Sequence, residues 1–474
     1  MRCLALPLFT VAMTASPLAA EPVHRPNILF VLVDDFGARD LGCYGSEVYE
    51  TPNMDRLAKS GVLFTDAYVA YPRCVPSRFA IMTGKHPARY QGDRDSVHVE
   101  PDRDVTFGQP FAAAGYETFY AGKWHLGHGP SAVGFTTTVA AGEAGAARAH
   151  FAPYNVSKKG GGEKSAIEGL DDAPDGEYLT DRLTEETMKF VEANQDKPFL
   201  AVLAHYAVHT PIEAKKHITK RYQTKIDGIG FEEPFYEPES AGENLLVQNN
   251  ATYAAMIESV DKGLGRLLRQ LSQLELSEKT IVVLCSDHGG LSSRGSRREV
   301  ATSNRPFRAG KGHNYEGGLR VPLLIRWPGV TETGRVIETP VVTMDLFPTF
   351  LEIAELPLSP EEHLDGISLV PLLRDSSTEI KERTFFWHNP SPRPGSTADL
   401  FNSAMRKGKW KLLNFPEENR TELYDLENDA GESNNLAESE SAKKDELLAE
   451  LNRWRKSMGV SNEPRIRQKE RDRQ

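Results

Sequence analysis

The chain has 474 residues, of which 39% are hydrophobic and 26% are charged. This composition is typical of a soluble globular protein, and the length exceeds what one hydrophobic core of ordinary size uses, so we expect a large domain with a smaller one. The 67 acidic residues outnumber the 56 basic ones, and the net charge of −11 argues against a nucleic-acid-binding protein.

Residues 1–20 have the layout of a secretory signal peptide. Arg2 precedes an apolar run over residues 4–15, and the small residues Ala19 and Ala20 end the segment. The run is too short to span a bilayer, and the alternative to a signal peptide is a frayed hydrophobic N-terminus. Cleavage near Ala20 would leave 55 basic residues against 67 acidic ones, a net charge of −12. No later segment reaches membrane length, so we expect an exported, soluble protein, periplasmic or secreted.

Short apolar runs recur along the chain and are separated by helical patterns. They lie at residues 28–33, 118–121, 199–204, 281–285 and 321–327. Continuous runs of this kind are typical of strands that are covered on both faces, so they predict an α/β fold with a large, mostly parallel sheet sandwiched by helices. Ligands of such sheets bind beyond the carboxyl ends of the strands, and the polar residues that follow these runs are therefore the candidate site residues.

Two helices between these strands are well marked in the sequence. One begins with Thr51 as N-cap and Pro52 in its first turn, and it ends at Gly61. The other carries apolar residues at spacings of three and four over residues 253–271, which places them on one face. Both patterns fit helices that cover a sheet.

Two long loops and a smaller C-terminal unit complete the predicted organisation. Residues 134–176 are rich in Gly and Ala and residues 289–312 in Ser and Arg, and loops of this length are usually functional or disordered. Short alternating runs such as 409–413, followed by a charged helical pattern over 441–454, predict a small antiparallel sheet with a packed helix. The predicted units are a signal peptide (1–20), a large domain (21–370), a C-terminal subdomain (371–463) and a frayed tail (464–474).

Acidic residues follow two of the predicted strands. Asp34 and Asp35 come directly after the first run, and Asp287 and His288 follow the run at 281–285. Adjacent carboxylates repel each other unless a cation lies between them, although a solvated turn would explain an isolated Asp-Asp pair. Two strand ends can offer three carboxylates and an imidazole to one ion. Such a set favours Ca²⁺ first and Mg²⁺ second, and His288 leaves room for a transition metal.

Three cysteines remain beyond the signal segment. An odd number leaves at least one unpaired, and Cys43 and Cys285 could pair or could be buried separately. Cys74 opens the run Cys-Val-Pro-Ser-Arg, whose proline favours a helix start. Residue 74 is then expected at a helix N-terminus, where backbone N–H groups and the helix dipole favour an anion. A structural cysteine or a mildly acidic thiol is the alternative.

The run from Cys74 to Arg78 resembles the signature of the type I, formylglycine-dependent sulfatases, arylsulfatase-like members of the alkaline phosphatase superfamily. Two departures are small: many relatives have Asn or Gln in place of His288, and Asp429-Ala430 replaces a usual Asp-Pro. The resemblance covers nearly the whole chain beyond the signal segment and implies an alkaline-phosphatase-like fold. The other stretches that resemble blocks of this family, in its order, are 27–35, 41–45, 51–67, 83–87, 122–127, 286–289, 310–318 and 423–426.

The resemblance implies a nucleophile that is made after translation. A formylglycine-generating maturation enzyme would oxidise Cys74, and the resulting aldehyde would hydrate to a geminal diol. One diol hydroxyl attacks sulfur and the other expels sulfate, whereas a serine would be left as a stable sulfate ester. The resemblance also implies one Ca²⁺ ion, which would promote deprotonation of the attacking hydroxyl. The ion would be held by Asp34, Asp35, residue 74, Asp287 and His288.

Five further catalytic residues follow from the same resemblance. Arg78 would hold the nucleophile, and Lys123 would contact the sulfate. His125 would remove a diol proton when sulfate is expelled, and His209 would protonate the leaving oxygen. Lys311 would bind a sulfate oxygen as charge develops on it. For each residue alone, a surface cation or a core histidine is the alternative.

Several features bear on the substrate. His313 and Tyr315 are candidates for the wall of the pocket. Five arginines lie between residues 290 and 310 against a single acid, Glu299, and this run is either a solvated face or a rim that gathers a polyanionic substrate. The arginines are at positions 294, 297, 298, 305 and 308. The loops expected to select the substrate are 128–178, 211–250 and 386–403.

The predicted activity is hydrolysis of a sulfate monoester. A sulfated carbohydrate is favoured as substrate over an aryl or choline sulfate, because exported relatives commonly act on such carbohydrates. One alternative is a phosphonate or phosphate ester hydrolase of the same superfamily, since some of these also use formylglycine. The other is a non-catalytic binder of sulfated glycans, which would require the loss of a catalytic residue.

Overall fold

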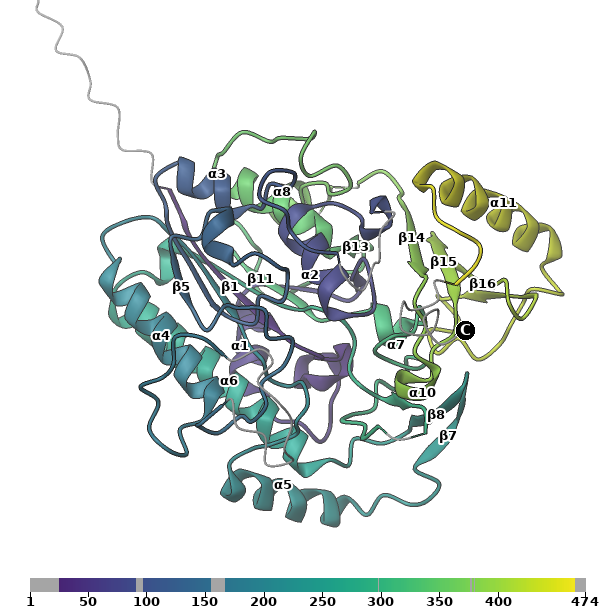
Figure 1. Cartoon of the computed structure of the whole chain (residues 1–474), viewed down its shortest axis with the longest axis horizontal. Helices are drawn as coiled ribbons and strands as arrows, with labels where there is room; N and C mark the ends of the chain where they lie inside the picture. The colour runs from purple at the N-terminus through teal and green to yellow at the C-terminus, as the bar shows by residue number, and fades with distance from the viewer. Residues whose placement is uncertain are drawn as a thin grey trace, which may run out of the picture.

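The computed structural model describes residues 25–90, 97–154, 167–296, 298–375, 377–378 and 380–464 (Figure 1). The predicted signal peptide, Arg297 and residues 465–474 of the predicted tail lie outside the described residues. Within the described part, no helix combines the length and the apolar character needed to cross a membrane.

An eight-stranded sheet forms the centre of the molecule, with the strand order β12-β2-β11-β9-β1-β6-β4-β5. All neighbouring strands are parallel except at β11, which is antiparallel to both β9 and β2. The predicted mostly parallel α/β sheet is therefore confirmed, and the run at 321–327 supplies its antiparallel strand. The strands are β1 (Asn27–Val33), β2 (Val62–Phe64), β4 (Glu117–Gly122), β5 (Thr137–Val139), β6 (Phe199–Ala204), β9 (Thr280–Ser286), β11 (Leu323–Arg326) and β12 (Arg335–Ile337).

Helices cover both faces of this sheet, which explains why the strands read as continuous apolar runs. In β1, Phe30 packs into the core on one face and Val31 into the core on the other. The first face is covered by α2 (Cys74–Thr83), α3 (Gly108–Ala113), α8 (Leu346–Ile353) and α9 (Val370–Arg374). The second is covered by α1 (Pro52–Ser60), α4 (Leu179–Ala193), α5 (Lys216–Ile229) and α6 (Ala251–Gln273).

The two helices expected from the sequence form where predicted. Helix α1 begins after Thr51 and ends before Gly61. Thr51 does not cap the backbone with its side chain; its hydroxyl donates to Asp55 instead. Helix α6 begins two residues before the predicted stripe, where the Asn250 side chain caps it by accepting the N–H groups of Thr252 and Tyr253.

The two predicted long loops contain strands that the sequence did not indicate. Strand β5 lies within 134–176 and pairs with β4 at the edge of the sheet. Strand β10 (Ser293–Arg294) lies within 289–312 and pairs with β8 (Gly242–Leu245), which forms a hairpin with β7 (Tyr236–Glu239). Strands of two to four residues are too short to carry a periodic signal, so tertiary pairing alone defines them.

The C-terminal unit is a four-stranded antiparallel sheet with a helix packed on it, as predicted. Its strands are β14 (Thr384–Asn389), β15 (Asn402–Lys407), β16 (Trp410–Phe415) and β17 (Arg420–Asp425). Leu447 and Leu451 of α11 (Ser441–Met458) pack on the sheet residue Leu412, and Figure 1 shows this unit to the right of the central sheet. The remaining short elements are α7 (Glu316–Leu319), α10 (Pro394–Thr397) and the pair β3 (Ala67–Tyr68) and β13 (Val341–Val342).

Candidate active site

Two neighbouring strands bring the predicted acidic residues together. In the parallel pair β1 and β9, Val33 lies opposite Ser286, so the residues that follow, Asp34 and Asp287, leave the sheet side by side. The Asp35 N–H donates to Asp287 Oδ1 at 3.2 Å. Asp35 has a φ of 60°, a left-handed conformation that aspartate tolerates better than most residues.

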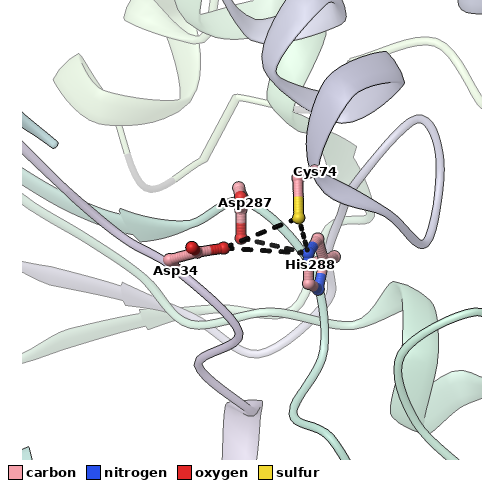
Figure 2. A group of neighbouring side chains, drawn as sticks. All are labelled: Asp34, Cys74, Asp287 and His288. Atoms are coloured by element: carbon pink, nitrogen blue, oxygen red, sulfur yellow. Dashed lines mark hydrogen bonds and ion pairs between the residues drawn. The ribbon is translucent and has the colours of Figure 1, made fainter. Parts of the chain in front are cut away.

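Cys74 is the first residue of α2, so the predicted helix start is where the sequence placed it. Its Sγ lies 3.2 Å from His288 Nε2 and 3.7 Å from both Asp34 Oδ1 and Lys311 Nζ. Figure 2 shows the Cys74 side chain pointing from the helix end toward Asp34, Asp287 and His288. The thiol therefore marks the position where a modified residue 74 would present its reactive group.

Each of the three carboxylates has a cationic partner. Arg78, one helical turn beyond Cys74, is fully buried. Besides its ion pair with Asp287, it donates a hydrogen bond to the Lys123 carbonyl at 2.6 Å. Arg78 is thus a buried residue of the site and not a cation on a helix surface. The nitrogen–oxygen distances are 2.6 Å for Lys123 with Asp34, 2.8 Å for Arg78 with Asp287 and 2.6 Å for Lys311 with Asp35.

The carboxylates differ in how strongly they hold a proton. Burial raises the pKa of Asp34, but the Lys123 ammonium and other cations lower it by more, so it lies well below the ordinary value of 3.8. Burial and the neighbouring Asp34 charge raise the pKa of Asp287 to about 7. Burial lowers the pKa of His288, but Asp287 and Cys74 raise it by more, to about 9. A divalent cation would take over the charge compensation that these protons supply.

The site also stabilises negative charge at residue 74. Burial raises the pKa of the Cys74 thiol, but Lys123 and Lys311 lower it by more, so it lies well below its ordinary value of 9.0. The same two cations would favour the ionised form of a hydroxyl at this position.

The residues fit a hard divalent cation. Asp34, Cys74, Asp287 and His288 each place a ligand atom within 4.8 Å of the others, and so do Asp35, Cys74 and His209. Asp35 Oδ2 is buried and accepts no hydrogen bond. His288 Nδ1 lies 3.1 Å from the Gly289 carbonyl, which can only accept, so Nδ1 carries a proton and Nε2 faces the site. Once Nε2 has lost its own proton, it would offer a lone pair to the ion. The set is rich in carboxylate oxygen, with one imidazole.

The two remaining predicted histidines approach the site differently. The His125 ring bonds with Cys74, and burial lowers its pKa below 6.5. An added Cβ at Gly145 would lie 2.5 Å from this ring, so glycine there leaves room for it. His209 Nε2 lies 3.8 Å from Asp35 Oδ2, and its Nδ1 donates to the Thr210 carbonyl at 2.8 Å. Burial lowers the pKa of His209 to about 4.

Sequence reasoning missed a buried cluster around Arg73, the residue before Cys74. Arg73 Nη2 lies 2.7 Å from both carboxylate oxygens of Asp399. The Asn389 amide donates to Asp399 and to the carbonyl of Gly312, whose own N–H donates to the Pro72 carbonyl. The cluster joins the residues beside Cys74 and Lys311 to the 389–399 segment, and no motif in the sequence marks it.

His150 was also missed by sequence reasoning. It is buried, and its Nε2 donates to the His209 carbonyl at 3.1 Å, which positions the backbone of that residue. The contact links residues 59 positions apart, so no local pattern could have indicated it.

The arginine run is largely neutralised by the β7–β8 hairpin. Three of its described members form ion pairs with glutamates of that hairpin, whereas Arg298 donates to the Ser396 hydroxyl at 3.1 Å. The pairs are Arg294 with Glu243, Arg305 with Glu237 and Arg308 with Glu239. These three arginines therefore connect the run to the β7–β8 hairpin, although Arg305 remains partly exposed in its pair.

The two candidate pocket residues face the C-terminal unit. His313 Nε2 donates to the Thr397 carbonyl at 2.7 Å, and the Tyr315 hydroxyl donates to Glu422 at 2.7 Å. Cys43 and Cys285 are both free thiols, the second fully buried in β9.

Comparison with known proteins identifies the family. A family model described as Sulfatase matches residues 26–356, and a second, described as N-sulphoglucosamine sulphohydrolase, C-terminal, matches residues 309–457. The steryl-sulfatase of Mus musculus is 31% identical over 484 residues, with 82% of this chain and 73% of the relative covered. This chain belongs to the sulfatase family. Sulfatases are sulfuric ester hydrolases, so this protein is an enzyme that hydrolyses sulfate esters.

Carbohydrate sulfatases are among the relatives of this sulfatase. The N-acetylgalactosamine-6-sulfatase of Canis lupus familiaris is 31% identical over 409 residues, with 80% of this chain and 72% of the relative covered. The crystal structure of Ps i-CgsB in complex with k-i-k-neocarrahexaose is similar, with a TM-score of 0.73, 30% identity and coverage of 91% and 92% of the two chains. The alkaline-phosphatase-like fold expected from the sequence is thereby confirmed.

Proposed function

We propose that this sulfatase hydrolyses a sulfate monoester of a carbohydrate, using a formylglycine hydrate made from Cys74 and one bound Ca²⁺. The observation that carries the proposal is the position of Cys74 at a helix start, within 3.7 Å of Asp34 and Lys311 and closer still to His288. The carbohydrate relatives support the substrate class.

Residue 74 would supply two hydroxyls, one to attack sulfur and one whose deprotonation expels sulfate. Asp34, Asp35, Asp287 and His288 would hold the cation, whose charge lowers the pKa of a bound hydroxyl. Lys123 and Lys311 neutralise charge as it moves onto the sulfuryl oxygens, because both ammonium groups already lie beside the Cys74 thiol in the buried site.

Two histidines would handle the protons. His125, which bonds with residue 74, accepts a proton from the hydroxyl that remains when sulfate is expelled. His209 donates a proton from Nε2 to the oxygen of the departing alcohol. A bound sulfate ester brings a negative charge beside His209, which raises the pKa of its imidazole and favours the protonated form.

The alternatives have less support. A phosphonate or phosphate ester hydrolase would share the metal site, but the matched family model is that of sulfatases. A non-catalytic glycan binder would lack part of the machinery, whereas Cys74, Arg78, Lys123 and Lys311 all lie together at the strand ends. We further propose that the protein is exported through its N-terminal segment and meets the maturation enzyme before use.

Replacement of Cys74 by alanine tests this mechanism. We expect Cys74→Ala to abolish hydrolysis of sulfated mono- and disaccharides, with Cys43→Ala as a matched control that retains activity. Peptide mass spectrometry of active enzyme should show formylglycine at position 74. Full activity of Cys74→Ala, or an unmodified thiol in active enzyme, would refute the mechanism, and faster hydrolysis of phosphonate than of sulfate esters would refute the substrate class.

A further inference from the structure

A cavity lies apart from the catalytic residues, beside β8 and β10. Its volume is about 790 Å³, within the range of pockets that hold small ligands. Its lining is polar and includes Glu243, Arg294, Arg298 and Glu299. The cavity is therefore suited to a hydroxylated or charged ligand and not to an apolar one.

The wall of this cavity is held together by backbone contacts. The Gly295 N–H donates to the Ser396 carbonyl at 3.0 Å, and the Ala241 N–H donates to the Ala398 carbonyl at 2.9 Å. An added Cβ at Gly295 would lie 2.1 Å from the Pro394 carbonyl oxygen, so only glycine allows this close approach. The two β segments and α10 form one continuous surface.

The two described arginines that line the cavity differ in their partners. Arg294 pairs with Glu243 at 2.6 Å and stacks over the Tyr236 ring at 4.2 Å. Arg298 is half-buried, and its hydrogen-bond partner is the neutral hydroxyl of Ser396. Among the described residues, no carboxylate lies within ion-pair distance of Arg298. Its guanidinium is free to bind the oxygens of an anionic group.

The cavity is close to the catalytic residues along two paths. Ser396 of α10 contacts Arg298, while the next residue, Thr397, accepts from Arg73, which precedes Cys74. Along the other path, five residues lie between His288 and Arg294, so the two are at most about 22 Å apart even in a fully extended chain. A short oligosaccharide is long enough to span that limit.

We propose that this cavity is a remote subsite for a second sulfated unit of an oligosaccharide whose reacting sulfate lies at residue 74. Arg298 binds the sulfate of the remote unit, and Glu243 and Glu299 accept hydrogen bonds from its hydroxyls. The inference rests on the carbohydrate substrate class proposed above, and it makes an extended sulfated chain the preferred substrate.

A length series of one sulfated saccharide tests the subsite through kcat/KM. In the unmodified enzyme, kcat/KM should rise from disaccharide to hexasaccharide. Arg298→Ala should lower it about tenfold or more on the hexasaccharide, because a hydrogen bond to a charged group is lost, and the loss should fall away as the substrate shortens. Arg305→Ala is the matched control, since it removes the same charge from the same run but does not line the cavity.

Binding tests the subsite independently of turnover. In calorimetry, the Cys74→Ala chain should bind the sulfated hexasaccharide, and the double variant Cys74→Ala, Arg298→Ala should bind it more weakly. The Cys74→Ala chain should bind the desulfated hexasaccharide no better than the double variant binds the sulfated one. Equal losses for Arg298→Ala and Arg305→Ala, or a loss independent of length, would overturn the subsite. If no sulfated saccharide of the series is hydrolysed, the hexasaccharide included, while hexasaccharide binding depends on Arg298, the proposed catalytic function fails and the subsite stands.

Discussion

His125 and His209 differ in their contacts, and the difference separates their proposed roles. His125 bonds with residue 74, whereas His209 faces Asp35 and has its Nδ1 fixed by the Thr210 carbonyl. A proton held at His209 Nε2 is therefore aimed into the site. Of these two histidines, His125 is the one that contacts Cys74.

We predict that His209→Ala loses about 10²–10⁴-fold in activity on a sugar sulfate, the usual contribution of general acid catalysis. A sugar alkoxide needs a proton to leave, whereas a nitrophenolate does not, so the loss on nitrophenyl sulfate should be much smaller. His125→Ala should lose activity on both, because expulsion of sulfate is common to every substrate. Steady-state kinetics on the two substrates measures this, and equal losses for both variants would contradict the assignment.

Metal binding should depend on the carboxylates more than on the imidazole. We expect one Ca²⁺ per chain by elemental analysis and a higher unfolding temperature with added Ca²⁺, because the ion binds only the folded site. His288→Asn exchanges one neutral ligand for another and should retain metal. Asp287→Ala should lose metal and also leave Arg78 without its carboxylate. Absence of stoichiometric metal, with activity untouched by exhaustive chelation, would contradict this prediction.

At the level of elements, the start of α2 is held by the segment that links β14 to β15. Arg73 is the N-cap residue of α2, and its side chain is buried against Asp399 and the Ser391 carbonyl. Breaking this ion pair would leave one charge buried without compensation. The C-terminal unit thereby fixes the backbone that presents Cys74.

We predict that Asp399→Asn lowers the free energy of unfolding by about 3–5 kcal/mol, because Arg73 is left uncompensated in a buried position. It should lower kcat more than it raises KM, since a displaced helix start misplaces residue 74. The double variant Arg73→Gln, Asp399→Asn should recover stability. Glu278→Gln, at an exposed ion pair with Arg326, is the control and should change stability by less than about 1 kcal/mol. A change in stability without a change in kcat would leave Asp399 with a merely structural role.

Across the whole molecule, a buried charge cluster joins the central sheet to the C-terminal unit. Lys411 of β16 lies 2.7 Å from Glu316 of α7 and 2.9 Å from Glu432, and all three side chains are inaccessible to solvent. Glu316 has a second cation, Arg320, at 2.6 Å. Burial raises the pKa of Glu432 from 4.5 to about 7, although Lys411 opposes the shift.

Lys411→Met should therefore destabilise the protein by about 3–5 kcal/mol at pH 8, mainly because the buried Glu432 carboxylate loses the cation that compensates its charge. Between about pH 4.5 and 7 the folded protein holds a proton on Glu432 that the unfolded chain has lost, so this group lowers the free energy of unfolding as pH rises. Without Lys411 the folded-state pKa of Glu432 rises further, and the variant should lose less stability at pH 5.5 than at pH 8. Urea unfolding at both pH values measures the difference.

Lys409→Met is the matched control for this change. Lys409 is partly exposed and pairs with Asp425 at 2.7 Å, so its loss should destabilise the protein far less than the loss of Lys411 does at pH 8. Equal destabilisation by Lys411→Met at pH 5.5 and pH 8 would contradict the assignment to Glu432.

Local patterns in the sequence were enough to predict the central sheet, the helix start at Cys74 and the acidic strand ends. A strand covered on both faces must be apolar throughout, which makes such strands visible in the sequence. Residues that follow parallel strands meet at one edge of the sheet, so Asp34 and Asp287 could be placed together from the sequence alone. The roles of Lys123 and Lys311 came from resemblance, because a lysine in isolation carries no such signal.

Folding in three dimensions determined the rest, because the decisive contacts join residues far apart in the chain. Arg73 and Asp399 are 326 positions apart, and the arginine run meets its acidic partners on a hairpin some 50 to 70 positions earlier. Ion pairs and short paired strands depend on which distant surfaces meet, and hydrophobic periodicity does not encode that. Consequently Arg294 pairs with a carboxylate whereas Arg298, within the described part of the chain, contacts a neutral hydroxyl, although nothing in the local sequence distinguishes the two arginines.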